Sequence, residues 1–243
     1  MSAPIIVIPA RLAATRLHGK PLVEIGGEPM IIHVWRRACA SRLGPVLVAA
    51  DCAEIAEAVA SAGGSVVLTS PDHLSGSDRV CEALAAFDPG RRFDIVVNLQ
   101  GDLPTIDPAH LGKAVAALGE AATDIGTLAA PISSDQELAD PNIVKVGGLR
   151  LPSGHLKALY FGRAAAWDEG PLYHHIGLYA YRRAALERFA ALPPSPRECR
   201  ERLEQLRALE NGMRIDVALI DKPAFGVDTP ADLERARAIL RQR

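Results

Sequence analysis

Short apolar runs alternate with longer amphipathic stretches through the first half of the chain. Residues 29–40 place apolar side chains on one face at helical spacing, which predicts a helix. The apolar runs around it are too short for typical helices and favour buried strands. They lie at residues 5–8, 46–50, 66–68 and 94–99. The alternation continues to about residue 130 and predicts an α/β fold with a layered, mostly parallel sheet.

Residues with strong end preferences mark the helix boundaries. Asp51 with Glu54 has the spacing of a capping box, and Gly63-Gly64 suits the end of that helix. Asp107 before Pro108 predicts another helix start, and so does Thr229 before Pro230. These signals place helices between the predicted strands and one more at the end of the chain.

The pattern changes after Pro131. Strand-like segments at 144–146, 156–161 and 176–182 are separated by glycine and proline rather than by helices. A helical pattern returns at 196–210, and an apolar run at 215–220 predicts a further strand. We therefore expect a single domain over 1–243 with an antiparallel insertion at about 131–190, used for dimerisation or as a lid.

Composition narrows the class of protein. The chain has 243 residues, 49% hydrophobic and 23% charged, which is typical of a soluble globular protein. A net charge of -2 gives no overall basic field, so we expect no nucleic-acid partner. Four scattered cysteines suggest reduced thiols. No apolar run is long enough to span a membrane and no leader pattern stands at the start, which predicts a cytoplasmic protein with no membrane partner.

The loop after the first predicted strand concentrates positive charge. Arg11, Arg16 and Lys20 lie within ten residues, and a bound polyanion such as a phosphate chain would relieve their mutual repulsion. An ordinary basic surface loop explains the same residues. The loop is not a P-loop, because Pro21 follows Gly19-Lys20, and no G-x-G-x-x-G occurs in the chain.

A small polar segment, Ser75-Gly76-Ser77-Asp78-Arg79, precedes a predicted helix. Its hydroxyls and backbone N–H groups suit an anion or the edge of a base. A simple N-cap accounts for it equally well.

Two aspartates stand at the ends of predicted elements in other parts of the chain. Asp102 follows the strand at 94–99 after a glycine, and Asp228 precedes the last helix. Carboxylates at such ends can share a hard cation such as Mg²⁺ with phosphate oxygens, although Gly-Asp is also a common turn.

The second half offers further polar candidates. Arg163 follows two aromatic residues and could hold a carboxylate. His174 and His175 are adjacent, and on a strand their side chains would point to opposite faces, which argues against a shared metal. Glu204 and Arg207 have the spacing of a surface ion pair on a helix.

Six motifs in order, from Pro9 to Leu240, resemble the nucleotide-activating sugar transferases. The opening stretch is Pro9-Ala10-Arg11, then Thr15-Arg16-Leu17 and Gly19-Lys20-Pro21-Leu22. Within that group the chain looks most like the 3-deoxy-manno-octulosonate (Kdo) cytidylyltransferases. The resemblance implies a Rossmann-like, nucleotide-diphospho-sugar transferase fold. It also implies CMP transfer from CTP to the anomeric hydroxyl of Kdo, giving CMP-Kdo and pyrophosphate for lipopolysaccharide synthesis, with Mg²⁺ as cofactor and a homodimer.

The resemblance also implies roles for individual residues. The catalytic set is Arg11, Lys20, Asp102 and Asp228, of which Asp102 and Asp228 are the metal ligands. The nucleotide would contact Pro9, Ala10, Arg11, Arg16, Lys20, Ser75, Gly76, Ser77 and Arg79. The acidic sugar would contact Gln100, Arg163, His175, Tyr179, Glu204 and Gln205.

The chain departs from the family pattern at a few positions. Leu103 stands where some members have glutamate, which excludes a metal ligand there, and His18 stands where proline is common. Gly162 replaces a usual serine or threonine, which makes the sugar contacts the weakest part of the comparison. Three alternatives stay open: a related acidic or amino-substituted sugar as substrate, a glycosyltransferase, and a nucleotide-binding regulator without turnover.

Overall fold

The computed structural model describes residues 4–13, 17–73 and 75–241. The chain divides into two compact units, one of Met1–Leu111 with Ala224–Arg243 and one of Gly112–Pro223. The sequence prediction of one domain with an insertion at about 131–190 stays a prediction. None of the helices in the described ranges is long and apolar enough to cross a membrane.

A parallel sheet forms the centre of the first unit. Its strands lie in the order β5, β4, β1, β6. Their bounds are β1 Ile5–Ala10, β4 Val46–Ala50, β5 Ser65–Leu68 and β6 Ile95–Leu99. In this register Val7 lies opposite Leu47 on one side and Asn98 on the other. The predicted short apolar strands and their parallel arrangement are confirmed.

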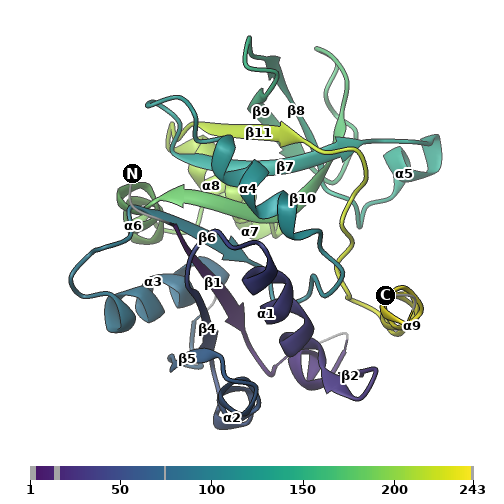
Figure 1. Cartoon of the computed structure of the whole chain (residues 1–243). Coiled ribbons are helices and arrows are strands. Elements are labelled where there is room, and N and C mark those ends of the chain that lie inside the picture. The colour runs from purple at the N-terminus through teal and green to yellow at the C-terminus, as the bar shows by residue number, and fades with distance from the viewer. Residues whose placement is uncertain (1–3, 14–16, 74, 242–243) are drawn as a thin grey trace. The chain divides into compact units, whose positions relative to one another are not determined.

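Three helices connect these strands, and a fourth, α4, follows β6. They are α1 Met30–Ala40, α2 Ala53–Ser61, α3 Gly76–Phe87 and α4 Pro108–Ala116. Because crossovers between parallel strands are right-handed, connections running in opposite directions along the sheet cover opposite faces. Figure 1 shows α1 and α3 on opposite sides of β1. The strand order therefore reverses between β1 and β6, and a ligand crevice is expected at the carboxyl ends of these two strands.

The capping box predicted for α2 is wrong. Its N-cap is Cys52, without a side-chain cap hydrogen bond. The Asp51 carboxylate instead accepts the backbone N–H of Leu12, at 3.0 Å to each oxygen. Asp51 thus ties the loop after β1 to the end of β4 and is not available to the helix.

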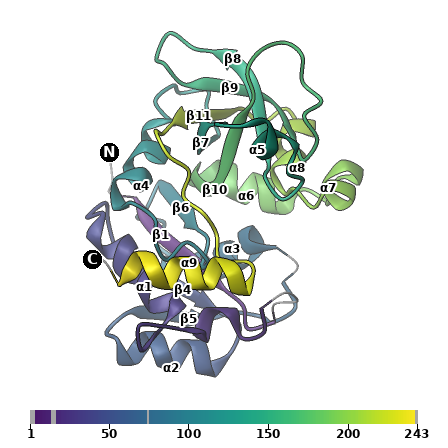
Figure 2. The same cartoon turned by 90° about the vertical axis from the view of Figure 1, so that its right-hand side faces the viewer.

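The last helix of the chain belongs to the first unit. A 3₁₀ turn, Lys20–Leu22, leads into the small hairpin of β2 Glu24–Ile25 and β3 Glu28–Pro29. Ile25 and Met30 share a buried cluster with Leu233 of α9 Pro230–Leu240. Figure 2 shows α9 (yellow) crossing this part of the unit. The predicted Thr229 cap is confirmed as a full capping box with Asp232.

Five strands form the sheet of the second unit. They are β7 Ile125–Pro131, β8 Lys145–Arg150, β9 Leu156–Gly162, β10 Tyr173–Arg182 and β11 Ile215–Leu219. The order is β10, β7, β11, β9, β8, and β8 also pairs with β10, so the strands close on themselves. In this sheet the β7–β11 pair is parallel, whereas the β10–β7, β10–β8, β11–β9 and β8–β9 pairs are antiparallel. The antiparallel character predicted after residue 131 is confirmed, whereas its use in dimerisation remains a prediction.

The helical part of this unit differs from the prediction. Its helices are α5 Asp135–Ala139, α6 Arg183–Ala191, α7 Pro196–Glu201 and α8 Gln205–Glu210. The single helix predicted at 196–210 is wrong because Arg202 adopts a left-handed conformation, φ 55°, which ends α7. The break lets Glu198 of α7 form an ion pair with the buried Arg207 of α8, at 2.6 Å. In one continuous helix, Glu198 and Arg207 would lie nine positions apart along the axis, which is too far for this ion pair.

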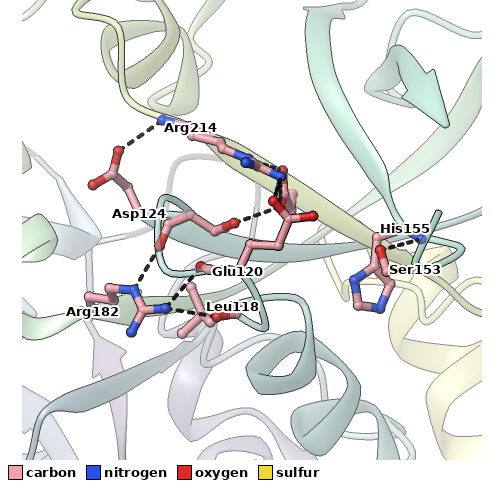
Figure 3. Close-up of polar contacts among 9 residues, drawn as sticks. Leu118, Glu120, Asp124, Ser153, His155, Arg182 and Arg214 are labelled. Atoms are coloured by element: carbon pink, nitrogen blue, oxygen red, sulfur yellow. Dashed lines mark hydrogen bonds and ion pairs between the residues drawn. The ribbon is translucent and has the colours of Figure 1, made fainter. Parts of the chain in front are cut away.

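Two arginines secure the loop that follows α4. The Arg182 guanidinium donates to the carbonyl oxygens of Leu118 and Glu120 at 2.8 and 3.0 Å. The Arg214 backbone N–H donates to Asp124, and its guanidinium is 2.8 Å from Glu120 (Figure 3). Since these contacts satisfy carbonyls left open after the helix, the loop is bound to β10 and β11.

We expect Asp216→Ala to lower the free energy of unfolding by about 1–3 kcal/mol, because it removes a buried acceptor for the Thr123 hydroxyl and one of the two carboxylates that pair with Arg214. Asp216 is 1% exposed, accepts a hydrogen bond from Thr123 at 2.6 Å and binds Arg214 at 2.9 Å. Urea unfolding would measure the change. Asp221→Ala, at an exposed position, is the control and should change stability by no more than about 0.5 kcal/mol. Equal stability of the two variants would contradict this role of Asp216.

Candidate active site

A lysine bridges two carboxylates at the crevice between β1 and β6. The Lys20 ammonium lies 2.8 Å from Asp102 Oδ2 and 2.8 Å from Asp228 Oδ1. The three side chains come from the turn after β1, the loop after β6 and the segment before α9. The structure thus brings together three of the four residues predicted to be catalytic, although they are up to 208 positions apart in the sequence.

Backbone contacts hold the two aspartates side by side. The Val227 N–H donates to the Asp102 carbonyl at 2.9 Å, which sets the neighbouring Asp228 beside Asp102. Gly101 lies close to β1, since a Cβ there would stand 3.0 Å from the Pro9 carbonyl oxygen. Only glycine allows this approach without displacing the strand.

The charges at this point compensate one another. Burial alone would lower the pKa of the Lys20 ammonium, but Asp102 and Asp228 outweigh it and raise that pKa above its ordinary value. The Lys20 ammonium is therefore positively charged at neutral pH. The pair of carboxylates is built to hold positive charge.

The same pair fits a hard divalent cation. Their oxygens converge on one position, as the shared Lys20 contact shows, and Mg²⁺ is usually held by one or two carboxylates together with substrate phosphates. In the ranges that the structure describes, no group of three or more His, Cys, Asp or Glu side chains could form a complete protein cage. A metal here would thus depend on ligands supplied by the substrate.

Two clefts follow the carboxyl end of β1. The first is lined by Pro9, Ala10, Arg11, Leu17, Lys20, Pro21, Gln100, Gly101, Asp102 and Asp228. The second is lined by Pro9, Ala10, Arg11, His73, Ser75, Gly76, Arg79 and Gln100. Because both clefts share Arg11 and Gln100, they form neighbouring parts of one groove. Most of the predicted nucleotide contacts therefore line it, while the predicted Arg16 lies outside the described residues.

The serine-glycine segment begins α3 beside this groove. Ser75 caps the helix by accepting the Asp78 N–H at 3.1 Å, so the N-cap interpretation is confirmed. Arg79 is buried and donates to Thr69 Oγ1 at 2.6 Å, and burial lowers the pKa of its guanidinium. Ser77 Oγ is buried with no hydrogen-bond partner among the described residues. The segment that caps α3 therefore also lines the groove.

Sequence reasoning missed one residue that lines this groove and two polar residues that contact the segments around it. Asp51 anchors Leu12, His73 lines the second cleft, and Asn98 is buried with Nδ2 unpartnered within the described part of the chain. A signal was present for Asp51 and Asn98, since both are polar residues at the carboxyl ends of apolar strands. The signal for Asp51 was read as a helix cap.

Several residues predicted to contact the sugar lie together in the second unit. His175 is buried, with Nε2 3.0 Å from Thr127 Oγ1, and its ring centroid is 5.5 Å from that of Tyr179. The Tyr179 hydroxyl donates to Gln205 Oε1 at 3.2 Å. His174 contacts Glu137 at 2.8 Å instead, so the two adjacent histidines have different partners.

Arg163 and Glu204 occupy different surroundings. Arg163 Nε donates to the Glu201 carbonyl at 3.1 Å, and Nη1 donates to the Pro141 carbonyl at 3.0 Å. Glu204 is the N-cap residue of α8. The surface position considered for Arg207 is wrong, because Arg207 is 4% exposed and bound to Glu198. The sugar-contact roles of these residues stay predictions.

Stability should depend on pH through His175. Burial, with a smaller contribution from His174, lowers its pKa from 6.5 to about 3. As pH falls below 6.5 the unfolded chain binds a proton that the folded chain does not, so the folded state loses stability until about pH 3. We expect the wild type to lose up to about 1.4 kcal/mol more per pH unit than His175→Gln in this window. Urea unfolding from pH 7 to pH 4 would test this, and parallel curves would contradict it.

The chain matches a known family over most of its length. The cytidylyltransferase family model matches residues 5–215. The chain therefore belongs to the cytidylyltransferase family. A 3-deoxy-manno-octulosonate cytidylyltransferase of Methylobacterium radiotolerans is 62% identical over 244 residues, covering 100% of this chain and 99% of the relative. One of Rhodopseudomonas palustris strain HaA2 is 60% identical, covering 99% of each. Within the family, the chain belongs with the 3-deoxy-manno-octulosonate cytidylyltransferases.

Solved structures support the same fold. A CMP:2-keto-3-deoxy-manno-octonic acid synthetase in complex with CTP is 38% identical and superimposes with a TM-score of 0.89, covering 99% of each chain. A nucleotidyl transferase of Methanothermobacter thermautotroptrophicus, 18% identical, has a TM-score of 0.61 over 99% of each chain and shares the fold alone. The predicted α/β, nucleotidyltransferase-like fold is confirmed.

Proposed function

We propose that the chain transfers CMP from CTP to the anomeric hydroxyl of Kdo and releases pyrophosphate. The observation that carries this proposal is the Lys20 bridge between Asp102 and Asp228, at the edge of a groove that Arg11 and Gln100 also line. Cations beside a carboxylate pair suit a triphosphate that brings a metal ion. The identity of the relatives and their shared length support the choice of CTP and Kdo.

The reaction needs placement and charge neutralisation rather than covalent participation by the protein. The anomeric oxygen forms a bond to the α-phosphorus while the bond to the bridging oxygen breaks, and pyrophosphate leaves. The hydroxyl proton passes to solvent. Arg11 and Lys20 would neutralise phosphate charge in the groove. Asp102 and Asp228 would hold Mg²⁺, which supplies positive charge against phosphate oxygens when bound.

Pyrophosphate release tests the proposal directly. The protein is incubated with each of CTP, UTP, ATP and GTP, with and without Kdo and Mg²⁺. We expect release only with CTP, Kdo and Mg²⁺ together. Release with a different acidic sugar would change the acceptor, and no release in any combination would reject the transferase.

Other features that the resemblance implies are part of the same proposal. They are a homodimer, a cytoplasmic location and a place in lipopolysaccharide synthesis. Sedimentation velocity of the purified chain would test the first, since a dimer has twice the 25.9 kDa mass of the chain.

A further inference from the structure

A lysine in the second unit is fully buried. Lys145, on β8, is 0% exposed, and its ammonium donates to the carbonyl oxygens of Asp140 at 2.5 Å and Arg163 at 2.8 Å. Burying an ammonium is costly unless hydrogen bonds replace its water. These bonds join the backbone at Asp140 to the backbone at Arg163. The placement suggests that Lys145 fixes backbone position.

Arg163 continues the same set of contacts. Its own carbonyl is held by Lys145, while its guanidinium holds the carbonyls of Pro141 and Glu201 at 3.0 and 3.1 Å. Lys145 and Arg163 therefore form a two-cation clamp on backbone oxygens. The clamp connects the segment before β8, the end of β9 and the end of α7.

The last clamped residue stands at the break between α7 and α8. Glu201 ends α7, Arg202 turns the chain in a left-handed conformation, and α8 begins at Gln205. Gln205 is buried, receives the Tyr179 hydroxyl on Oε1, and has Nε2 without a partner in the described ranges. A buried amide donor without a partner is costly, and a hydrogen bond to a bound ligand would satisfy it. The position of that donor depends on the turn at Glu201.

We propose that Lys145 is a positioning residue for the acidic sugar. It acts through Arg163 and Glu201 on the turn that presents Gln205. The proposal rests on the proposed function, since it takes Kdo as the acceptor. Two of the Arg163 nitrogens donate hydrogen bonds to backbone carbonyls. Arg163 therefore holds the backbone in place, a role that the family motif alone does not indicate.

Steady-state kinetics of Lys145→Met with CTP, Kdo and Mg²⁺ test the inference. The methionine fills similar volume without a donor, which releases both carbonyls. We expect the KM for Kdo to rise at least tenfold, while kcat and the KM for CTP stay within twofold of wild type. Lys157→Met, at an exposed lysine on β9, is the matched control and should leave both KM values unchanged.

Each outcome separates the two proposals. If the wild type releases no pyrophosphate from CTP and Kdo, the proposed function fails. If the wild type is active but Lys145→Met has an unchanged KM for Kdo, or loses both substrates equally, the positioning role is overturned. Lys145→Gln retains a shorter side chain with an NH₂ donor group and should give a smaller rise in the KM for Kdo. Failure of both variants to fold would assign Lys145 to stability and overturn the proposal.

Discussion

Asp102→Ala is expected to abolish turnover and to leave the fold intact, because of where its side chain lies. Asp102 lies at the end of β6, is 30% exposed, and contacts Lys20 and the segment of Asp228. The variant removes one of the two carboxylates proposed to hold Mg²⁺. Loss of a group that stabilises transition-state charge lowers kcat by about 10²–10³, and by more when a metal is lost with it. Pyrophosphate release at saturating Mg²⁺ measures the effect.

A matched carboxylate separates the role of Asp102 from loss of charge in general. Asp107 is exposed five positions later and caps α4 through the Ala109 N–H. Asp107→Ala should retain wild-type kcat, with a stability cost of about 1 kcal/mol for the lost cap. Thermal melts of both variants would confirm that they fold. Normal activity of Asp102→Ala at saturating Mg²⁺ would reject the two-aspartate metal site.

Lys20→Met is expected to lower kcat/KM for CTP by about 10²–10³, the usual cost of a lost charge-stabilising donor. The same substitution should strengthen binding of a divalent ion in the absence of nucleotide. The reason is that the Lys20 ammonium, 2.8 Å from both carboxylates, competes for the oxygens that would hold the metal. Mn²⁺ titration followed by electron paramagnetic resonance measures this affinity without any reaction.

The charge-retaining variant is the control for this prediction. Lys20→Arg keeps a cation beside Asp102 and Asp228, so its affinity for Mn²⁺ without nucleotide should remain close to that of the wild type. The double variant Lys20→Met with Asp102→Asn should lose the gained affinity, because one carboxylate is neutral. If Lys20→Met binds Mn²⁺ no better than the wild type does, the competition between lysine and metal is excluded.

The chemical character of the site was predictable from local sequence. The run at 5–8 ends where a strand should, and the cations at Arg11 and Lys20 follow it directly. Asp102 also follows an apolar run. Since ligands bind beyond the carboxyl ends of parallel strands, the pattern alone indicated the edge of the sheet, while it left a polyanion and an ordinary basic loop as alternatives there.

Local sequence misjudged the places where a side chain bonds to a distant partner. Asp51 has the spacing of a helix cap, but Leu12, 39 positions away, holds its carboxylate. The run at 196–210 has helical periodicity, yet Arg202 breaks it so that Glu198 can reach Arg207. Periodicity and capping rules consider only residues that are close in the chain. They do not take into account distant residues that folding brings near and that compete for the same hydrogen-bonding groups.

The sequence by itself determined the strands and helices of the first unit, the basic loop, and the family, because these depend on the order of side chains along the chain. Only the tertiary structure decided that Lys20 joins Asp102 to Asp228, since 82 and 208 positions separate these residues. It alone decided that Lys145 is buried against two carbonyls. Such contacts follow from the closing of sheets and the packing of helices, which bring together groups that no local pattern relates.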